Sequence, residues 1–211
     1  MRKDDVQVEP IRGLPELPPE GEHILWQGAP DPWTLALQAL NTGWVAGYFG
    51  LIAAWRGLVV GFEQGWALGL KATVPFLGMG LVACAILGAI AVTLARTTVY
   101  TLTNRRVAMR IGAALTVTLN LPFPCVLAAD LALNRNGTGT IALDLTAGTK
   151  LSYLVCWPHV RPWRIVNTQP ALRCIPDAAR VAELLAEAAQ ARLAVLSDPL
   201  RRAQPAVMAA E

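Results

Sequence analysis

Residues able to do chemistry are few and widely spaced in this chain. Its two histidines, His23 and His159, have no partners at the spacing of a metal site or a Ser-His-Asp triad. Cys156, His159 and Cys174 come nearest to a metal site, but they fall in or near different expected strands and lack a fourth ligand. Neither a P-loop nor a GxGxxG fingerprint occurs. We therefore expect no catalytic residue, no metal and no cofactor.

The elements that carry these residues begin with two apolar runs, Pro32–Trp55 and Ala72–Ala95. Neither run contains Asp, Glu, Lys or Arg. Each would extend about 36 Å as a helix, enough to cross a bilayer core of about 30 Å. The runs predict a membrane-integral α+β protein with a two-helix transmembrane hairpin over residues 32–95. The two spans are expected at about residues 34–58 and 70–95.

Arginines close to the end of the second span predict which side of the membrane it faces. Four follow within about 15 residues: Arg96, Arg105, Arg106 and Arg110. Because loops rich in Lys and Arg stay in the cytoplasm, this end and both termini are expected there. The connection between the spans, with Arg56 and Lys71, is a weaker opposing signal.

Neither span contains a histidine, the commonest metal-ligating side chain, so direct pigment binding is disfavoured. Asn41 or a backbone carbonyl stays open as a weaker pigment ligand. Small residues recur at four-residue spacing along both spans, a pattern that lets helices approach closely in lipid. The candidates for helix–helix packing are Gly43, Gly47, Gly80 and Gly88. Packing of the two spans on each other is the simplest interpretation, and the alternatives are a homodimer or docking on another membrane protein.

Residues 1–31 are rich in proline and carry three basic against seven acidic residues. This composition excludes a long helix and predicts an extended cytoplasmic arm near the membrane surface. Its one compact piece, residues 21–28, is expected to dock on another surface. At the other end, Ser197-Asp198-Pro199 is expected to close the last helix and leave a flexible tail over residues 197–211.

Residues 96–196 alternate apolar and polar side chains between Gly, Asn and Pro, which predicts a water-exposed β domain. A hairpin is expected to turn at Asn104-Arg105. Seven strands are expected: Thr98–Thr103, Arg106–Ile111, Leu115–Leu121, Cys125–Leu133, Thr138–Leu145, Lys150–Cys156 and Ala171–Ile175. After Pro176 the apolar spacing becomes helical, with Val181, Leu184 and Leu185 starting one stripe.

Two groups of side chains in this domain are candidates for binding. Trp157, Arg161, Trp163 and Arg164 lie between prolines in an irregular loop, and such aromatic and basic groups often dominate protein interfaces. Burial against the β domain is the alternative. Arg105, Arg106 and Arg110 form the densest basic group and could contact anionic lipid or a partner, at about 1 kcal/mol per charge. The alternative is a topology signal on a solvated hairpin.

Seven antiparallel strands followed by one amphipathic helix is the order of a pleckstrin-homology (PH)-like sheet or partial barrel. The segment Tyr100–Val107, directly after a membrane hairpin, resembles the opening hairpin of bacterial membrane-anchored PH-like domains. The residues Gly13–Glu16, Gly21–Asp31, Ala54–Arg56 and Thr118–Phe123 are similar to the PuhB family, the photosynthetic complex assembly proteins of purple bacteria. This resemblance covers the chain up to about residue 195.

The PuhB resemblance implies an assembly factor for the photosynthetic reaction centre and its core antenna. The implied partners are reaction-centre subunits and membrane lipids, without nucleic acid, in the cytoplasmic or intracytoplasmic membrane. The family offers no catalytic motif to carry over. Without the resemblance, the residues indicate only a membrane-tethered interaction module. A generic PH-like scaffold or lipid-sensing module unrelated to photosynthesis is therefore the alternative.

Overall fold

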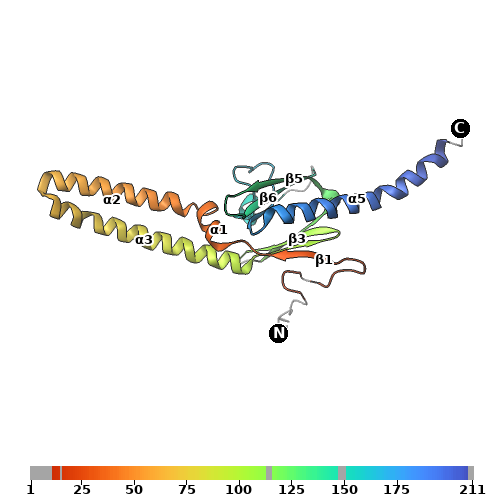
Figure 1. Ribbon diagram of the computed structural model, residues 1–211, viewed down its shortest axis with the longest axis horizontal. Coiled ribbons are helices and arrows are strands. Elements are labelled where there is room, and N and C mark those ends of the chain that lie inside the picture. The colour runs from red at the N-terminus through yellow and green to blue at the C-terminus, as the bar shows by residue number, and fades with distance from the viewer. Residues whose placement is uncertain (1–10, 15, 113–115, 147–150, 209–211) are drawn as a thin grey trace, which may run out of the picture. The chain divides into compact units, whose positions relative to one another are not determined.

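The computed structural model describes residues 11–14, 16–112, 116–146 and 151–208, with side chains described up to residue 197. The chain divides into two compact units. The first, here called the β unit, combines residues 1–30 with residues 96–211, and the second, here called the helical hairpin, is Asp31–Ala95. Figure 1 labels the elements of both units.

The first sheet of the β unit contains four antiparallel strands in the order β1-β2-β3-β4. Their bounds are Ile24–Gly28 (β1), Val99–Thr103 (β2), Arg106–Ile111 (β3) and Val117–Pro122 (β4). The expected turn at Asn104-Arg105 is confirmed. The Thr103 hydroxyl accepts hydrogen bonds from the backbone N–H groups of Arg105 and Arg106 at 3.2 and 3.1 Å. The expected β4 start, Leu115, lies outside the described residues.

Strand β1 comes from the N-terminal arm, where no strand is expected from the sequence. It pairs with β2, and Gly28 lies opposite Tyr100. The Asn104 side chain secures the preceding residues, since its Oδ1 accepts the His23 N–H at 3.1 Å and its Nδ2 donates to the Gly21 carbonyl at 2.9 Å. The arm is therefore part of the β unit, and the helical hairpin is inserted between two adjacent strands of one sheet.

The second sheet contains three antiparallel strands in the order β5-β6-β7. They are Val126–Leu133 (β5), Gly139–Leu145 (β6) and Ala171–Ile175 (β7), and a 3₁₀ turn, η1 (Phe123–Cys125), leads into β5. The strand expected at Lys150–Cys156 is wrong: Tyr153–Cys156 forms a helical turn, α4, and Lys150 lies outside the described residues. Within the described residues, the two sheets thus contain six expected strands and β1.

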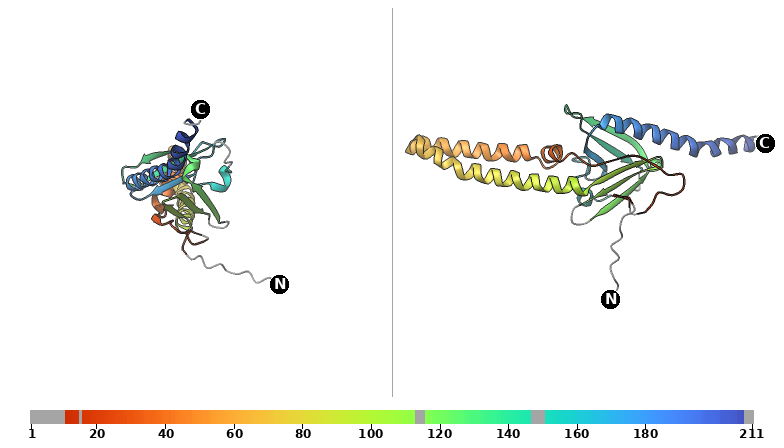
Figure 2. Two further views of the ribbon diagram at one scale, coloured as in Figure 1. Left: turned by 90° about the vertical axis from the view of Figure 1, so that its right-hand side faces the viewer. Right: turned by 60° about the horizontal axis from the view of Figure 1, so that its bottom comes forward.

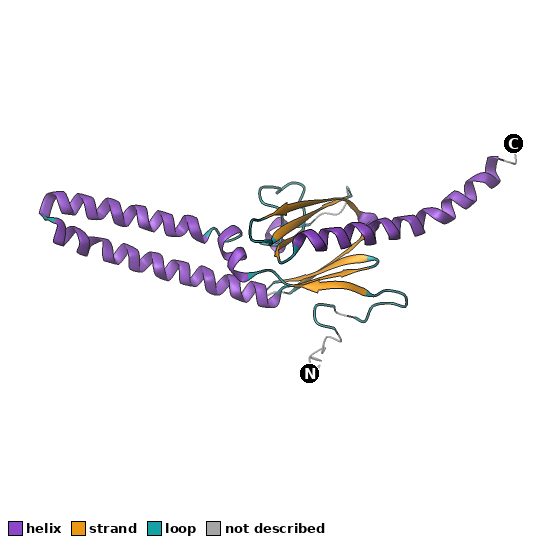
Figure 3. Ribbon diagram, viewed as in Figure 1, coloured by secondary structure: helices purple, strands orange, loops and turns teal. Residues whose placement is uncertain are grey.

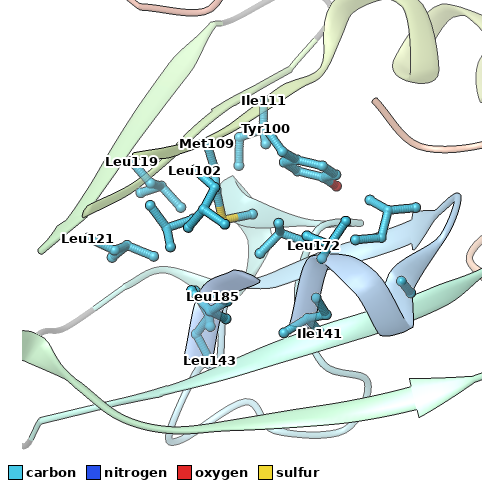
Figure 4. Close-up of a cluster of buried hydrophobic side chains, with 14 of the residues drawn as sticks. Tyr100, Leu102, Met109, Ile111, Leu119, Leu121, Ile141, Leu143, Leu172 and Leu185 are labelled. Carbon is cyan, nitrogen blue, oxygen red and sulfur yellow. The ribbon is translucent and has the colours of Figure 1, made fainter. Parts of the chain in front are cut away.

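Apolar side chains from both sheets meet in one core. In Figure 3 the strands form two groups, and Figure 4 shows that Tyr100, Leu102 and Met109 of the first group face Ile141 and Leu172 of the second. All five are at most 2% exposed. At about 1.5–3 kcal/mol for each fully buried large apolar side chain, this cluster is the main source of stability in the β unit.

Helix α5 (Ala178–Met208) closes this core with its first half. Val181, Leu185 and Ala188 are buried in the core cluster, as the apolar stripe predicts. The expected end at residues 197–199 is wrong, because the helix continues past Pro199 to Met208. A proline removes one backbone donor, but the turns on either side of it can stay helical. Figures 1 and 2 show α5 extending past the strands.

The helical hairpin contains α1 (Pro32–Gln38), α2 (Thr42–Gln64) and α3 (Trp66–Thr97). The Asp31 carboxylate caps α1 by accepting the Thr34 N–H at 2.7 Å. Asn41, in the left-handed region at φ 53°, separates α1 from α2. The first long helix therefore covers residues 42–64 rather than 34–58, and the second begins before residue 70.

Gly65 alone, at φ 97°, joins α2 to α3, so Arg56 and Lys71 lie on helices rather than in a connection. Both helices are long and apolar enough to cross a membrane by length and composition. Only 17% and 11% of their most apolar stretches are buried within the chain, so most of this apolar surface is exposed.

Candidate functional site

Thr98, Tyr100 and His159 form an enclosed hydrogen-bonded group where β2 meets the connection between β6 and β7. The Tyr100 hydroxyl lies 2.6 Å from His159 Nδ1, and the Thr98 hydroxyl lies 3.1 Å from His159 Nε2. The backbone N–H of Arg173 donates to the Tyr100 hydroxyl at 3.3 Å. Because Tyr100 accepts that bond, its own proton can go to Nδ1, which places the histidine proton on Nε2, toward Thr98.

Burial controls the charge of this group. It lowers the pKa of His159 to about 4, and the positive charge of Arg173 acts in the same direction. Burial also raises the pKa of Tyr100. Both side chains are therefore neutral at pH 7, and with exposures of 1% or less they cannot reach a substrate. Their role in this arrangement is to join β2 to the β6–β7 connection.

The cysteines near His159 do not build a metal centre with it. Within the described part of the chain, no three His, Cys, Asp or Glu side chains gather in a way that could hold a metal ion. Cys156 and Cys174 are buried. Burial raises the pKa of the Cys156 thiol, which disfavours the thiolate that a metal would need.

The basic group expected at the β2–β3 hairpin is split between the two ends of β3. Arg106 Nε pairs with the Glu22 carboxylate at 2.7 Å, and the Glu22 side chain is only 3% exposed. The Arg105 guanidinium donates to the Glu20 carbonyl at 3.0 Å. Both arginines therefore hold the arm. Arg110 lies opposite Val99, at the end of the sheet where the chain arrives from α3.

The expected aromatic loop is exposed rather than buried. Trp157 is 47% and Trp163 92% exposed, and Arg164 is exposed as well. Arg161 differs from the other three, because its guanidinium pairs with the Asp130 carboxylate of β5 and contacts the Gln169 side-chain oxygen at 3.2 Å. Trp157, Trp163 and Arg164 therefore lie at the surface. Arg161 instead connects the loop to β5 through Asp130.

The tip of this loop is held in a defined conformation. At its base, the Arg161 N–H donates to the Gln169 carbonyl and the Ala171 N–H to the His159 carbonyl, both at 2.9 Å. Trp163 has φ 66°, in the left-handed region, where a bulky residue carries strain of about 1–3 kcal/mol. An outlier of this kind, in a tryptophan held in solvent, supports a binding role for the tip.

Sequence reasoning missed four apolar neighbours of the tryptophans in the same connection. Leu154 is 85%, Val155 55%, Ile165 66% and Val166 96% exposed. These four residues and the exposed Trp157 and Trp163, all in the β6–β7 connection, are what we call the apolar loop surface. The run Ile165-Val166 directly after Arg164 is visible in the sequence, but whether these side chains are exposed depends on the tertiary structure. Clusters of exposed apolar residues mark interaction sites in many proteins.

The candidate packing glycines of the hairpin separate into two groups. A Cβ on Gly80 would lie 2.7 Å from Phe49 Cβ, so this glycine allows α2 and α3 to approach. Gly43, Gly47 and Gly88 have open space around them. The closest approach lies near the turn, where a Cβ on Gly69 would lie 2.6 Å from the Gly57 carbonyl oxygen.

Comparison with known proteins gives a family and a relative. A family model described as "Bacterial PH domain" matches residues 47–189, which include β2 to β7 and the start of α5 but not β1. A Rhodobacter capsulatus protein described as "Uncharacterized 23.7 kDa protein in puhA 5'region" is 46% identical over 195 residues, covering 92% of this chain and 91% of the relative. No solved structure matches the chain.

Proposed function

The chain belongs to the bacterial PH domain family, and we propose that it is a membrane-anchored, non-enzymatic assembly factor for the photosynthetic reaction centre and its core antenna. In this role it binds reaction-centre subunits or their assembly intermediates. The observation that carries the proposal is the relative whose printed name locates it in the 5′ region of puhA, a photosynthesis gene. An identity of 46% over nearly the full length of both chains supports a shared role.

The helical hairpin is the proposed anchor, and it crosses the membrane twice. Two observations support this. α2 and α3 have the necessary length and composition, and their apolar side chains are mostly exposed within the chain. The arginines that follow α3 favour a cytoplasmic β unit and cytoplasmic termini. The membrane is the cytoplasmic or intracytoplasmic membrane of a photosynthetic bacterium.

The apolar loop surface is the proposed contact with a reaction-centre subunit. Its exposed tryptophans are of the type that dominates binding energy in protein interfaces. The absence of catalysis is supported by the burial of His159, Tyr100 and Cys156, three side chains of a type that can act as acid, base or nucleophile. Binding, rather than conversion of a substrate, accounts for this distribution of exposed and buried groups.

A generic membrane-anchored PH-like scaffold or lipid-sensing module is the second candidate. The family match favours it as much as the first, because that match contains no reference to photosynthesis. Gene neighbourhood discriminates between the two. A position beside reaction-centre and pigment-synthesis genes in the source genome favours the assembly factor.

Deletion of the gene is expected to lower the amount of assembled reaction centre while pigment synthesis continues. The physical reason is that a binding factor changes the yield of a complex and not the supply of its components. Membrane absorption spectra and immunoblots of reaction-centre subunits measure the two quantities. Unchanged assembly in the deletion strain would remove the proposed function.

The same strain tests the contact surface. Complementation with Trp163→Ser/Val166→Ser should restore less reaction centre than the native gene does and should reduce co-purification of its subunits with the tagged protein. Leu193→Ser on α5 is the control, since Leu193 is also apolar and 47% exposed but lies outside the apolar loop surface. Equal co-purification by both variants would place the contact elsewhere.

A further inference from the structure

Strand β5 differs in exposure from the other strands that end the two sheets. Within the described residues, the first sheet ends at β1 and β4 and the second at β5 and β7. Strands β1 and β4 alternate between less and more exposed residues, and β7 is buried throughout. In β5 this alternation is absent, because every residue from Leu127 to Leu133 is exposed. Both faces of β5 are therefore open.

One of these faces lies on the core side of the second sheet. Residues directly opposite each other on antiparallel strands point their side chains to the same face. Ala129 pairs with Leu143 and Leu131 with Ile141, and both β6 residues are fully buried. Leu131 is nevertheless 40% exposed, so the packing that buries β6 covers β5 only in part. The core face of β5 thus presents apolar surface to its surroundings.

The register also shows where the backbone groups of β5 point. The Leu143 N–H donates to the Pro170 carbonyl at 2.8 Å, on the β7 side of β6. Ala129, opposite Leu143, therefore belongs to a non-hydrogen-bonded pair and points its N–H and C=O away from β6. Because this orientation repeats every second residue, Leu131 also points its N–H and C=O away from β6. These groups line the outer edge of the sheet.

This edge lacks features with which proteins commonly protect an exposed strand. Such strands often carry lysine, proline or a bulge. Residues 128–133 read Ala-Ala-Asp-Leu-Ala-Leu, and the bulge in β5 precedes them, between Val126 and Ala128. The charged side chain in this run, Asp130, pairs with Arg161. The outward row of N–H and C=O groups is complementary to an extended backbone, so the occupant that it selects is a strand.

We propose that β5 binds an extended segment of the partner subunit, which joins the second sheet as an added strand. Backbone hydrogen bonds to Ala129 and Leu131 give affinity, and apolar side chains at alternate positions of the segment cover the core face of β5. The Arg161–Asp130 ion pair links β5 to the β6–β7 connection, so this edge extends the contact assigned to the apolar loop surface. The source of the segment, a reaction-centre subunit, rests on the proposed function.

A proline at position 129 separates strand addition from contact through side chains. Ala129→Pro removes an outward N–H and leaves the N–H groups that bond β6, and edge strands tolerate proline at such positions. Ala129→Thr is the matched control, because it keeps the donor and favours a strand. In the complemented deletion strain, Ala129→Pro should lower co-purification of reaction-centre subunits by about fivefold, the effect of one lost backbone hydrogen bond. Ala129→Thr should retain native co-purification.

Amide hydrogen exchange on the native sequence gives a second measurement, which does not depend on the folding of a variant. The full-length protein in detergent is compared with its co-purified complex with reaction-centre subunits. The Ala129 and Leu131 amides should exchange about tenfold more slowly in the complex, whereas the Asp130 amide, which points toward β6, should change little. Unchanged exchange at Ala129 and Leu131 overturns the proposal. Equal slowing in the concentrated protein alone assigns the edge to a second copy of this chain and also overturns it.

Failure of this inference and failure of the proposed function give different results. Normal reaction-centre assembly in the deletion strain overturns the function and, with it, this partner. Lowered assembly in the deletion strain that Ala129→Pro restores as fully as the native gene overturns strand addition alone.

Discussion

At the scale of single residues, the same side-chain types have opposite roles according to burial. His159 is 1% exposed and joins β2 to the β6–β7 connection, whereas His23 is exposed at the start of β1. Among the arginines, Arg106 pairs with the Glu22 carboxylate, whereas Arg12 donates to the backbone carbonyl of Arg96. Residue type alone does not decide which partner a cation takes.

The low pKa of His159 predicts loss of stability in acid. The folded state holds His159 neutral down to about pH 4, whereas the unfolded chain takes up a proton near pH 6.5. Stability from this residue is therefore complete above pH 6.5 and declines as the pH falls toward 4, by about 3 kcal/mol in total. Denaturation of the full chain in detergent, followed by circular dichroism at several pH values, measures the slope.

The two histidines provide a matched comparison for this prediction. His159→Gln should flatten the profile between pH 6.5 and 4 and lower stability at pH 7, because the Tyr100 and Thr98 hydrogen bonds are altered. His23→Gln should keep the native slope. The prediction is contradicted if the two variants show the same dependence on pH.

At the scale of elements, α5 contributes to the core of the β unit through its first half. The buried positions Val181, Leu185 and Ala188 are spaced by three and four residues, and the described apolar side chains from Ala191 to Leu196 are exposed. Strand β1 shows the opposite relation between length and contribution. It has only five residues and precedes the helical hairpin in the sequence, yet it adds the fourth strand to the first sheet. An element's contribution therefore follows from its buried face and not from its length.

An acid on the buried face of α5 should destabilise the β unit. Leu185 is 5% exposed, so Leu185→Asp loses apolar burial and places a charge in the core, at a cost of about 3–5 kcal/mol. Leu184→Asp should cost less, because Leu184 is only partly buried. Leu193→Asp should be nearly neutral. Thermal unfolding of the three proteins gives the order, and a Leu193 variant as unstable as Leu185→Asp would contradict it.

At the scale of the whole molecule, the pairing of β1 with β2 constrains membrane topology without reference to charge. Residues 24–28 and 99–103 form hydrogen bonds in one sheet, so both lie on the same side of any membrane. A membrane-spanning segment between them must therefore cross an even number of times. The two long helices joined at Gly65 satisfy this condition.

Cysteine labelling tests this topology. Glu63→Cys, next to the α2–α3 turn, should react with a membrane-impermeant maleimide in cells with a permeabilised outer membrane. Arg135→Cys in the β unit should react only after the inner membrane is broken, and the native chain measures the background from its own cysteines. Labelling of both sites from outside would contradict a spanning hairpin with a cytoplasmic β unit.

The sequence by itself determined the local elements of this protein. Uncharged apolar runs predict the two long helices, and the alternation of apolar and polar residues predicts six of the strands. Each of these patterns can be recognised within the segment that forms the element. The apolar stripe likewise predicts which face of α5 is buried. The sequence also identified the tryptophans and Arg164 as binding candidates in a loop between prolines, but it left open their burial against the β domain, and the tertiary structure decided for exposure.

Only the tertiary structure decided which distant segments meet. β1 becomes a strand because it pairs with β2, although the helical hairpin separates the two strands in the sequence. No local sequence pattern encodes this pairing. Residues 153–156 form a helical turn instead of the expected strand. In this turn the side chains of Leu154 and Val155 are exposed. Arg12, Arg96 and Arg110 line one pocket for the same reason: long-range pairing, which sequence periodicity does not report, brings three separate chain segments to one end of a sheet.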